Sequence, residues 1–379
     1  MALFSLEVLK AKGGDCFLLH FGRPEDPRLM LIDGGPEIAY RSGLAQRLRQ
    51  LREDRELDTL VLELAVVAHA DSQHMGGIVQ LLRDLADERA RAEVEIRELW
   101  HNSLDALFDN FAGALLESAA AEVGDAAIGL EVPSAGLSRE ASTVLASVGE
   151  ARSLARLAER LALPLNRRLG VLTSDLGTVA LGGGLELTVL SPDPELKKDL
   201  TATWERELER LSSDLDVAGG AAAYADASAY RLASLVLVAQ SAGRRMLLPG
   251  DARSDDILAG LARAGLLADG KLHVDLLKLP GHGSDRNVNA DFFAAVTADH
   301  YVVSADGRHG NPDPSVFAMI RAARPREPYT VWLTYPPEHL ESASPTGAEL
   351  RRVLRRETVR HIAEDEISIV IDLDEPVLG

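Results

Sequence analysis

Short apolar runs alternate with turn-forming residues over the first third of the chain. Runs of alternating or continuous apolar residues are typical of β-strands, and leucines at helical spacing predict helices over residues 42–53 and 75–92. Turns such as Gly13-Gly14-Asp15 and Asp33-Gly34-Gly35 separate these runs. The strands predicted in this third are residues 4–10, 16–21, 29–32, 60–67 and 96–100.

The middle of the chain has a different pattern. From residue 104 to residue 163 it is almost purely helical and rich in Ala, Leu and Glu, with a polar break around residues 133–138. No linker-like segment brackets this stretch, so we interpret residues 104–163 as a helical insertion within a single domain spanning residues 1–379. A separate helical domain is the weaker interpretation. A further helix is predicted over residues 194–213, before a loop of small residues at 217–229.

Strands and helices resume in the rest of the chain. Gly182-Gly183-Gly184 predicts a hairpin between residues 178–181 and 185–190, and a second hairpin is predicted between residues 234–239 and 245–248. Strands and hairpins flanked by helices predict an α/β fold, with mixed sheets covered by helices on their outer faces. The later predicted elements are strands 274–279, 301–303, 330–334 and 367–371 and helices 291–296, 314–323 and 347–355.

The composition is that of a globular protein with a strong negative charge. The chain has 40 Lys and Arg against 59 Asp and Glu, a formal net charge of −19. This charge disfavours duplex nucleic acid and anionic membranes as partners, but it leaves open a small anionic substrate held by a metal ion. Cys16 is the single cysteine, which excludes an intrachain disulfide and a zinc site of several thiolates. We see no signal peptide and no membrane-spanning apolar run, so we predict a cytoplasmic location.

The strongest chemical signal is the loop His69-Ala70-Asp71-Ser72-Gln73-His74. A buried strand is expected to deliver His69 at its end, and His74 is expected to open a helix. Two imidazoles and a carboxylate within six residues, on a strand-to-helix turn, can converge on one divalent ion. Two loop histidines more often only form hydrogen bonds, but the spacing and the apolar strand before them favour the metal-binding interpretation.

Two further strand ends carry residues of the same kind. Residues 246–248 form an apolar run that ends in Pro249-Gly250-Asp251, which places a carboxylate at the carboxyl edge of a strand, where ligands tend to bind. The run ending at Lys278-Leu279 is followed by Pro280-Gly281-His282-Gly283-Ser284. Each of these motifs is weak alone, and their order along the chain gives them their weight.

That order resembles the metallo-β-lactamase superfamily, and more closely the branch that includes the hydrolase domain of bacterial DNA-uptake competence channels. Residues 69–77 match the His-x-Asp-x-Asp-His-x-Gly-Gly motif of that branch at all positions but one. Residues 278–284 are similar to its Lys-x-x-His-His-Gly-Ser motif, and Gly14-Asp15-Cys16 with residues 31–35 match its opening strands. The resemblance covers most of the chain but says little about residues 104–163.

The resemblance implies an αββα metallo-β-lactamase sandwich with a metal site along one edge. A water becomes a hydroxide nucleophile in this fold because the ion lowers its pKa to about 7, and Asp71, Gln73 and His282 are the candidate catalytic residues. The implied reaction is hydrolysis of an ester, an amide or, as this branch favours, a phosphodiester. The implied cofactor is zinc or manganese, as one or two ions. The implied metal ligands are His69, Asp71, His74, Asp251 and His282.

Three positions depart from the pattern of the branch. Gln73 stands where the branch has an aspartate that binds the second ion, and a glutamine is a neutral, weaker ligand that cannot act as a base near neutral pH. Gly281 replaces the first of two adjacent histidines, and Arg231 falls near a position often occupied by asparagine. The second ion is therefore expected to bind weakly or not at all. The alternative hypothesis is a catalytically impaired protein that keeps the fold and serves as a binding or interaction module.

Other residues are weaker candidates. His309 is placed where it could face a substrate and His101 where it could support a ligand, but such histidines are as often solvated or structural. Asp15 and Asp33 are expected to brace loops beneath the site. The expected substrate is a small anion or a phosphodiester. The helices of residues 104–163 are consistent with a lid over the site or with a surface for a protein partner.

Overall fold

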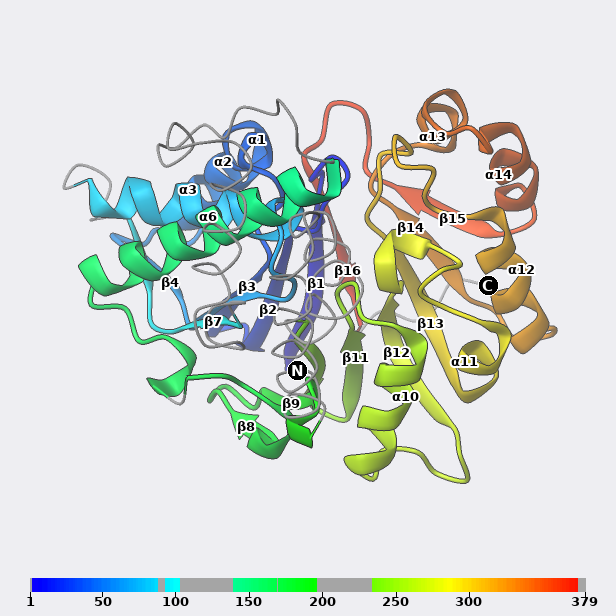
Figure 1. Cartoon of the computed structure of the whole chain (residues 1–379), viewed down its shortest axis with the longest axis horizontal. Helices are drawn as coiled ribbons and strands as arrows, with labels where there is room; N and C mark the ends of the chain where they lie inside the picture. Colours follow the sequence, from blue (N-terminus) through cyan, green and yellow to red (C-terminus); the bar gives the residue numbers. More distant parts are fainter. Residues whose placement is uncertain (1, 88–92, 103–138, 169, 196–233, 374–379) are drawn as a thin grey trace, which may run out of the picture.

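Two β-sheets pack face to face, and helices cover the outer face of each sheet (Figure 1). This arrangement is the αββα sandwich that the resemblance implied. No helix among the residues described here has an apolar stretch long enough to cross a membrane. The computed structural model describes residues 2–87, 93–102, 139–168, 170–195 and 234–373.

The first sheet contains, in spatial order, β16 (Ser368–Asp372), β1 (Leu3–Leu9), β2 (Phe17–Arg23), β3 (Asp26–Ile32), β5 (Leu64–Val67) and β7 (Leu99–His101). β1, β2 and β3 form an antiparallel meander, and β5 and β7 continue the sheet parallel to β3. The turn between β1 and β2 therefore lies at the same edge as the carboxyl ends of β3, β5 and β7.

The second sheet contains, in spatial order, β15 (Thr358–His361), β14 (Thr330–Leu333), β13 (Val296–Val303), β12 (Leu272–Lys278), β11 (Arg244–Leu248), β10 (Val236–Ser241), β9 (Glu186–Ser191) and β8 (Thr178–Ala180). β11 to β15 run parallel, and β8 to β11 are antiparallel. Ala242 and Gly243 both have positive φ, which is the backbone that a two-residue hairpin requires between β10 and β11. Both predicted hairpins are confirmed.

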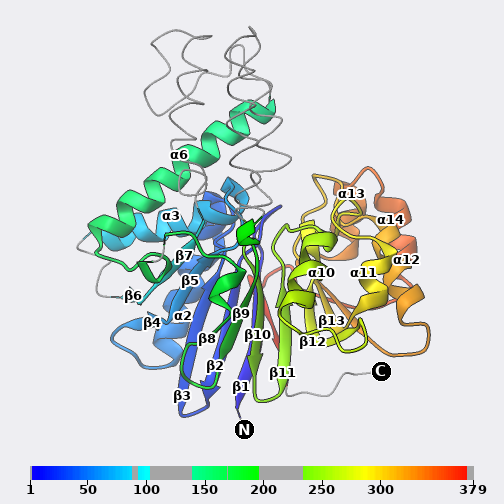
Figure 2. The same cartoon turned by 60° about the horizontal axis from the view of Figure 1, so that its bottom comes forward.

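Helices cover the two sheets on opposite sides of the molecule (Figure 2). The first sheet is covered by α1 (Glu37–Ala39), α2 (Ala45–Asp54), α3 (Ser72–Ala86) and α6 (Arg139–Arg160). The second is covered by α10 (Ser254–Arg263), α11 (Ala290–Ala295), α12 (Pro314–Ala323), α13 (Pro337–Ala343) and α14 (Gly347–Leu354).

Apolar side chains fill all three spaces between the four layers. Along β2, Phe17 and Leu19 point between the sheets, whereas Leu18 points towards the helices. This alternation follows from the two-residue repeat of a strand, and it explains why the strand is apolar on both faces. Across the middle layer the first sheet meets residues of the second such as Leu237 and Trp332. The tight interior fixes where each strand ends, and so where its terminal residues lie.

Two predicted strands are each divided in the structure. Residues 60–67 form β4 (Leu60–Leu62) and β5, which belong to different sheets because the chain turns at Glu63. Residues 96–100 are divided between β6 (Val94–Ile96) and β7, and β6 pairs with β4. The prediction of one continuous strand in each place was therefore wrong. Helices α10 and α13 and strand β15 were not predicted.

The insertion is described only in part. α6 lies within the predicted helical segment 104–163 and packs along α3 (Figures 1 and 2). The rest of that segment up to residue 138 lies outside the described residues. The same is true of the loop 217–229, of Arg231 and of the predicted helix 194–213 beyond residue 195.

Candidate metal centre

The strand ends at one edge of the sandwich carry the candidate site. β5 is followed by His69, β11 by Asp251, and β12 by a short turn that contains His282. α3 begins beside them, with Asp71 as its N-cap and His74 in its first turn. The structure therefore brings together all five residues that were expected to bind metal.

Short distances connect the side chains of these five residues. Asp251 lies 3.7 Å from His74 Nε2 through one carboxylate oxygen and 3.5 Å from His282 Nε2 through the other. His69 Nε2 lies 3.9 Å from Asp71 Oδ2. The His74 ring stands between the other two imidazoles, with its centroid 5.3 Å from that of His69 and 5.5 Å from that of His282. The cluster is thus compact enough to share a small cation.

Asp71 has two tasks at the start of α3. Its Oδ1 accepts hydrogen bonds from the backbone N–H groups of Gln73 at 2.9 Å and His74 at 3.1 Å, as an N-cap carboxylate does. The same oxygen lies 2.7 Å from His74 Nδ1. Asp71 therefore fixes the start of the helix and the orientation of the His74 ring, while its Oδ2 faces His69.

Each of the three imidazoles is held through its Nδ1 atom. His282 Nδ1 donates to the carbonyl oxygen of Ser304 at 2.8 Å, His69 Nδ1 lies 2.7 Å from Ser234 Oγ, and His74 Nδ1 is held by Asp71. Partners of this kind fix the ring and the tautomer of metal-binding histidines, so that Nε2 is the ligand atom. All three Nε2 atoms face carboxylates of the cluster.

Asp15 and Lys278 also belong to the cluster, and sequence reasoning did not place them there. Asp15 lies in the turn between β1 and β2, its side chain is fully buried, and its Oδ2 is 2.5 Å from Lys278 Nζ. Asp15 also lies 3.5 Å from His74 Nε2 and 3.3 Å from His282 Nδ1. The expectation that Asp15 braces a loop beneath the site was therefore incomplete, because its carboxylate stands among the candidate ligands.

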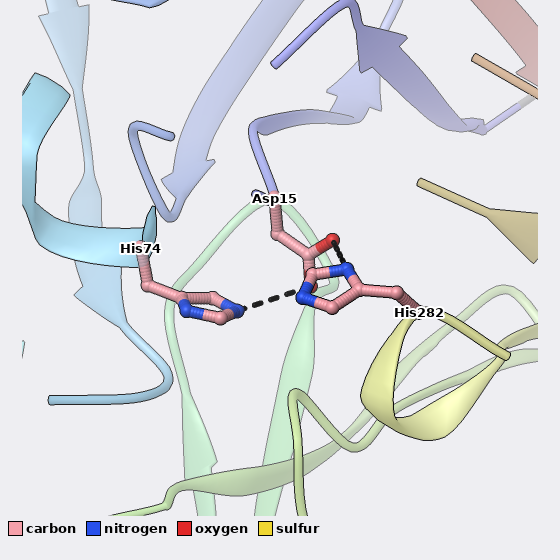
Figure 3. Close-up of side chains that lie close together, drawn as sticks. All are labelled: Asp15, His74 and His282. Carbon is pink, nitrogen blue, oxygen red and sulfur yellow. Dashed lines mark ion pairs between the residues drawn. The ribbon is translucent and has the colours of Figure 1, made fainter. Parts of the chain in front are cut away.

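The possible ligand atoms form two groups. The more buried one, here called the inner group, is Asp15, His74 and His282, whose side chains point towards one another in Figure 3. The other, called the outer group, is His69, Asp71 and Asp251. Within each group the ligand atoms lie within 4.8 Å of one another. Both oxygens of Asp15 and the Nε2 of His74 are buried without a hydrogen-bond partner, so a cation close to them would offset the cost of their burial.

The electrostatics of the cluster favour ionised carboxylates next to positive charge. Burial opposes the charge of Asp15, but Lys278 and His282 hold the pKa of this carboxyl group well below its ordinary range. Burial also opposes charge on His282, but Asp251 and Asp15 raise its pKa to about 9. The pKa of His69 is lowered, because the effect of burial exceeds that of the nearby carboxylates. The carboxylates thus stay ionised and attract positive charge to this buried place.

A small cavity opens next to the cluster. Its volume is about 180 Å³, and it touches the cluster through His282. Gln73 and His309 both line the cavity. Gln73, which stands where the branch has an aspartate, therefore faces this space. The other lining residues are Gly13, Ala305, Asp306, Gly307 and Asn311.

Gly281, the second departure, has a local explanation. Its φ is +55°, in the left-handed region, and a Cβ built there would lie 2.3 Å from Asn287 Oδ1. The amide of Asn287 in turn donates to the backbone oxygen of Asp251 at 2.8 Å. A histidine at position 281 would therefore displace Asn287, and His282 is the histidine that reaches the cluster.

Two other candidates lie near the site. Asp33 accepts a hydrogen bond from the backbone N–H of Ala68 at 2.7 Å, so it braces the end of β5 as expected, and burial raises its pKa to about 8. His101 ends β7 beside Val67; it is buried, neither ring nitrogen has a hydrogen-bond partner, and burial lowers its pKa to about 4. His101 is therefore neutral and does not contact the ligands through hydrogen bonds.

Comparison with known proteins gives distant matches only. No protein-family model matches the sequence, and no curated protein matches it. Among solved structures, a metallo-β-lactamase HARLDQ-motif mutant from Cronobacter sakazakii is 13% identical, with a TM-score of 0.29 over 69% of this chain and 70% of that one. A protein described as a metal-dependent hydrolase from Parabacteroides distasonis is 10% identical, with a TM-score of 0.32 over 94% and 92% of the two chains.

A third match differs in length. CmlA, a diiron β-hydroxylase from Streptomyces venezuelae, is 13% identical, with a TM-score of 0.39, and the match covers 98% of this chain but 54% of CmlA. The present chain thus spans about half the length of that protein. Similarity at this level transfers no activity, and the description of the fold rests on the sheets, layers and strand ends given above.

Proposed function

We propose that the chain is a metal-dependent hydrolase built on the metallo-β-lactamase fold. The observation that supports it is the convergence of His69, Asp71, His74, Asp251 and His282 at one buried edge. His74 Nε2 is buried there without a hydrogen-bond partner. The ion, when bound, lowers the pKa of a water to about 7 and polarises the bond to be cleaved. Imidazole nitrogens combined with carboxylate oxygens suit zinc best, and manganese is the second choice.

The residues around the ligands have separate tasks in this proposal. Asp71, Ser234 and Ser304 hold the three imidazoles through Nδ1 and orient Nε2 towards the ion. Gln73 lines the cavity, where its amide can bind a substrate oxygen but cannot accept a proton near neutral pH. His309, which lines the same cavity, is an imidazole that can exchange a proton with a substrate.

The proposed substrate is a small anion such as a phosphodiester or another ester. A cavity of about 180 Å³ beside the cluster admits a compact group. The net charge of −19 repels a long polyanion, whereas a local metal ion still attracts a small one. Duplex nucleic acid is therefore the less favoured substrate.

The first test is the metal content of protein purified without chelator. We expect about one equivalent or more of zinc or manganese in the native chain and a large loss in His69→Ala. His361→Ala, at an exposed position in the edge strand β15, is the matched control and should keep its metal. Trace metal that is the same in all three proteins would contradict the proposal.

Hydrolysis of bis(p-nitrophenyl) phosphate then separates an active centre from a structural ion. Gln73 and Gly281, both at departures from the expected motif, favour a second candidate function, a metal-holding binding module without hydrolysis. Turnover that is lost with His69→Ala supports the hydrolase. Full metal occupancy without hydrolysis of any ester, amide or phosphodiester supports the binding module.

A further inference from the structure

A lysine ammonium is enclosed within the candidate metal centre. Lys278 is the last residue of β12, and its side chain is 1% exposed. Its Nζ donates to the backbone oxygen of Gly250 at 2.9 Å and lies 2.5 Å from Asp15 Oδ2 and 3.5 Å from Asp251 Oδ1. An ammonium has three donors, and here two of the oxygens accept hydrogen bonds while the third, Asp15 Oδ2, forms an ion pair. The charge therefore has a fixed place in the cluster.

The position of this ammonium matters because a buried charge is costly without a partner. An isolated ammonium in a protein interior costs several kcal/mol or shifts its pKa, so its retention here requires the carboxylates around it. Its shortest contact is to Asp15, the only carboxylate of the inner group. That carboxylate is already paired with a cation before any metal binds, and the other two ligands of the inner group are imidazoles.

A charge count points in the same direction. The two groups contain three carboxylates, Asp15, Asp71 and Asp251, and Lys278 balances one of them. Histidines bind a metal ion as neutral imidazoles, so in the metal-bound centre the remaining two negative charges equal the charge of one divalent ion. A second divalent ion would leave a net positive charge in a buried place, with Gln73 supplying no carboxylate to offset it. Asp33 belongs to neither group, because it braces the backbone of Ala68.

We propose that Lys278 takes the electrostatic place of a second metal ion, so that the centre binds one divalent ion, at the outer group of His69, Asp71 and Asp251. This inference rests on the proposed function, because it requires that the centre binds metal. His74 and His282 lie within 3.7 Å of Asp251, so both can also reach that ion. Lys278 is thus a positioning residue, which holds Asp15 and sets the number of ions.

The test is metal stoichiometry, which needs no substrate. The full chain is loaded with Zn²⁺, freed of excess ion and assayed by mass spectrometry, and the expected native value is one ion per chain. Lys278→Met removes the charge at similar volume and should raise the value towards two. Lys278→Arg, which keeps the charge, and Lys271→Met, at an exposed lysine, should both stay at one.

A second measurement keeps the test decisive if Lys278→Met does not fold. In Mn²⁺-loaded native protein, electron paramagnetic resonance should show isolated ions and not an exchange-coupled pair, and Asp15→Asn should leave the stoichiometry at one. Two ions in the native chain, a coupled pair, or a folded Lys278→Met that stays at one would overturn the inference. Absence of metal from every protein would instead overturn the proposed function itself.

Discussion

Two buried carboxylates of the same hairpin show how differently one fold can treat a charge. Glu7 in β1 is fully buried, and its two oxygens lie 2.9 Å from His20 Nε2 and 2.5 Å from both Arg47 Nε and Ser368 Oγ. Asp15, in the following turn, is equally buried and pairs with Lys278, yet neither of its oxygens accepts a hydrogen bond of good geometry. Protein donors satisfy both carboxylate oxygens of Glu7, whereas the oxygens of Asp15 lack hydrogen-bond donors in a cluster of candidate ligands.

The comparison teaches that burial of a charge does not by itself mark a functional site. Burial acts against the charge of Glu7, but His20, Arg47 and Ser368 together lower its pKa to about 2. Those partners also connect β1 with β2, α2 and β16, so the carboxylate stabilises the fold. The candidate metal centre differs from the surroundings of Glu7 in that several buried polar atoms without a hydrogen-bond partner lie close together there.

The largest effect is expected at Asp251, which lies close to both His74 and His282. Asp251→Asn removes a charged ligand that contacts both groups, so metal affinity should fall by about 100-fold or more, beyond the usual effect of a supporting residue. Hydrolysis should fall with it. Metal titration followed by calorimetry checks the affinity. The control is Asp275→Asn, which changes a carboxylate that pairs with Arg244 and accepts a hydrogen bond from the backbone N–H of Arg245. Unchanged affinity would show that Asp251 is not a ligand.

Glu7→Gln should give the complementary result. The change leaves Arg47 and His20 facing a neutral amide in a buried place, and breaking a buried pair from one side costs about 3 kcal/mol of unfolding free energy. Metal content should not change, because Glu7 does not contact the cluster. Urea denaturation of the metal-free proteins measures the loss. If Glu7→Gln kept its stability but lost metal, Glu7 would support the metal centre and not the fold.

The same substitution has a defined pH dependence. Because the pKa of Glu7 is lowered in the folded chain, from 4.5 to about 2, its contribution is fully present above pH 4.5. The contribution is lost as the pH falls from 4.5 towards 2. The difference in unfolding free energy between the native chain and Glu7→Gln should therefore shrink over that window. A difference that stays constant with pH would mean that the charge of Glu7 is not what stabilises the fold.

These contrasts were only partly predictable from the sequence. His69, Asp251 and His282 each follow an apolar run, and strand ends at one edge of a sandwich are neighbours, so their convergence could be anticipated. Asp15 could not, because its role depends on Lys278, which is distant in sequence and whose side chain turns inward at the end of β12. The division of residues 60–67 depends likewise on Glu63, which pairs with Arg28 and Arg97 outside the local pattern.

Glu150, on α6, is a carboxyl group whose pKa is shifted in the opposite direction to that of Glu7. One of its oxygens is buried without a partner, and burial, with help from Asp71, raises its pKa to about 7. A raised carboxyl pKa means that stability is lost as the pH rises from 4.5 through 7. Glu150→Gln should therefore stabilise the chain by about 1–2 kcal/mol at pH 8, after allowance for partial exposure, and change little at pH 4.5.

Thermal unfolding at the two pH values measures this effect. Glu159→Gln, on the exposed side of the same helix, is the matched control and should be neutral at both. A stabilisation that is equal at pH 4.5 and pH 8 would show that helix propensity, and not the buried charge, is the cause. Stabilisation confined to high pH would show that the buried carboxyl group of Glu150 is more stable in its protonated form.

The smallest effect is expected at Gln73, where a carboxylate would add one more possible ligand beside the cluster. Gln73→Asp adds a negative charge beside a centre whose count otherwise matches one divalent ion, so a second ion should bind weakly and hydrolysis should change by less than about tenfold. Gln73→Asn, which adds no charge, is the control. If neither occupancy nor rate responds, position 73 does not limit the second ion. Lys278 would then be the stronger determinant, because its charge stands among the ligands whereas Gln73 faces the cavity.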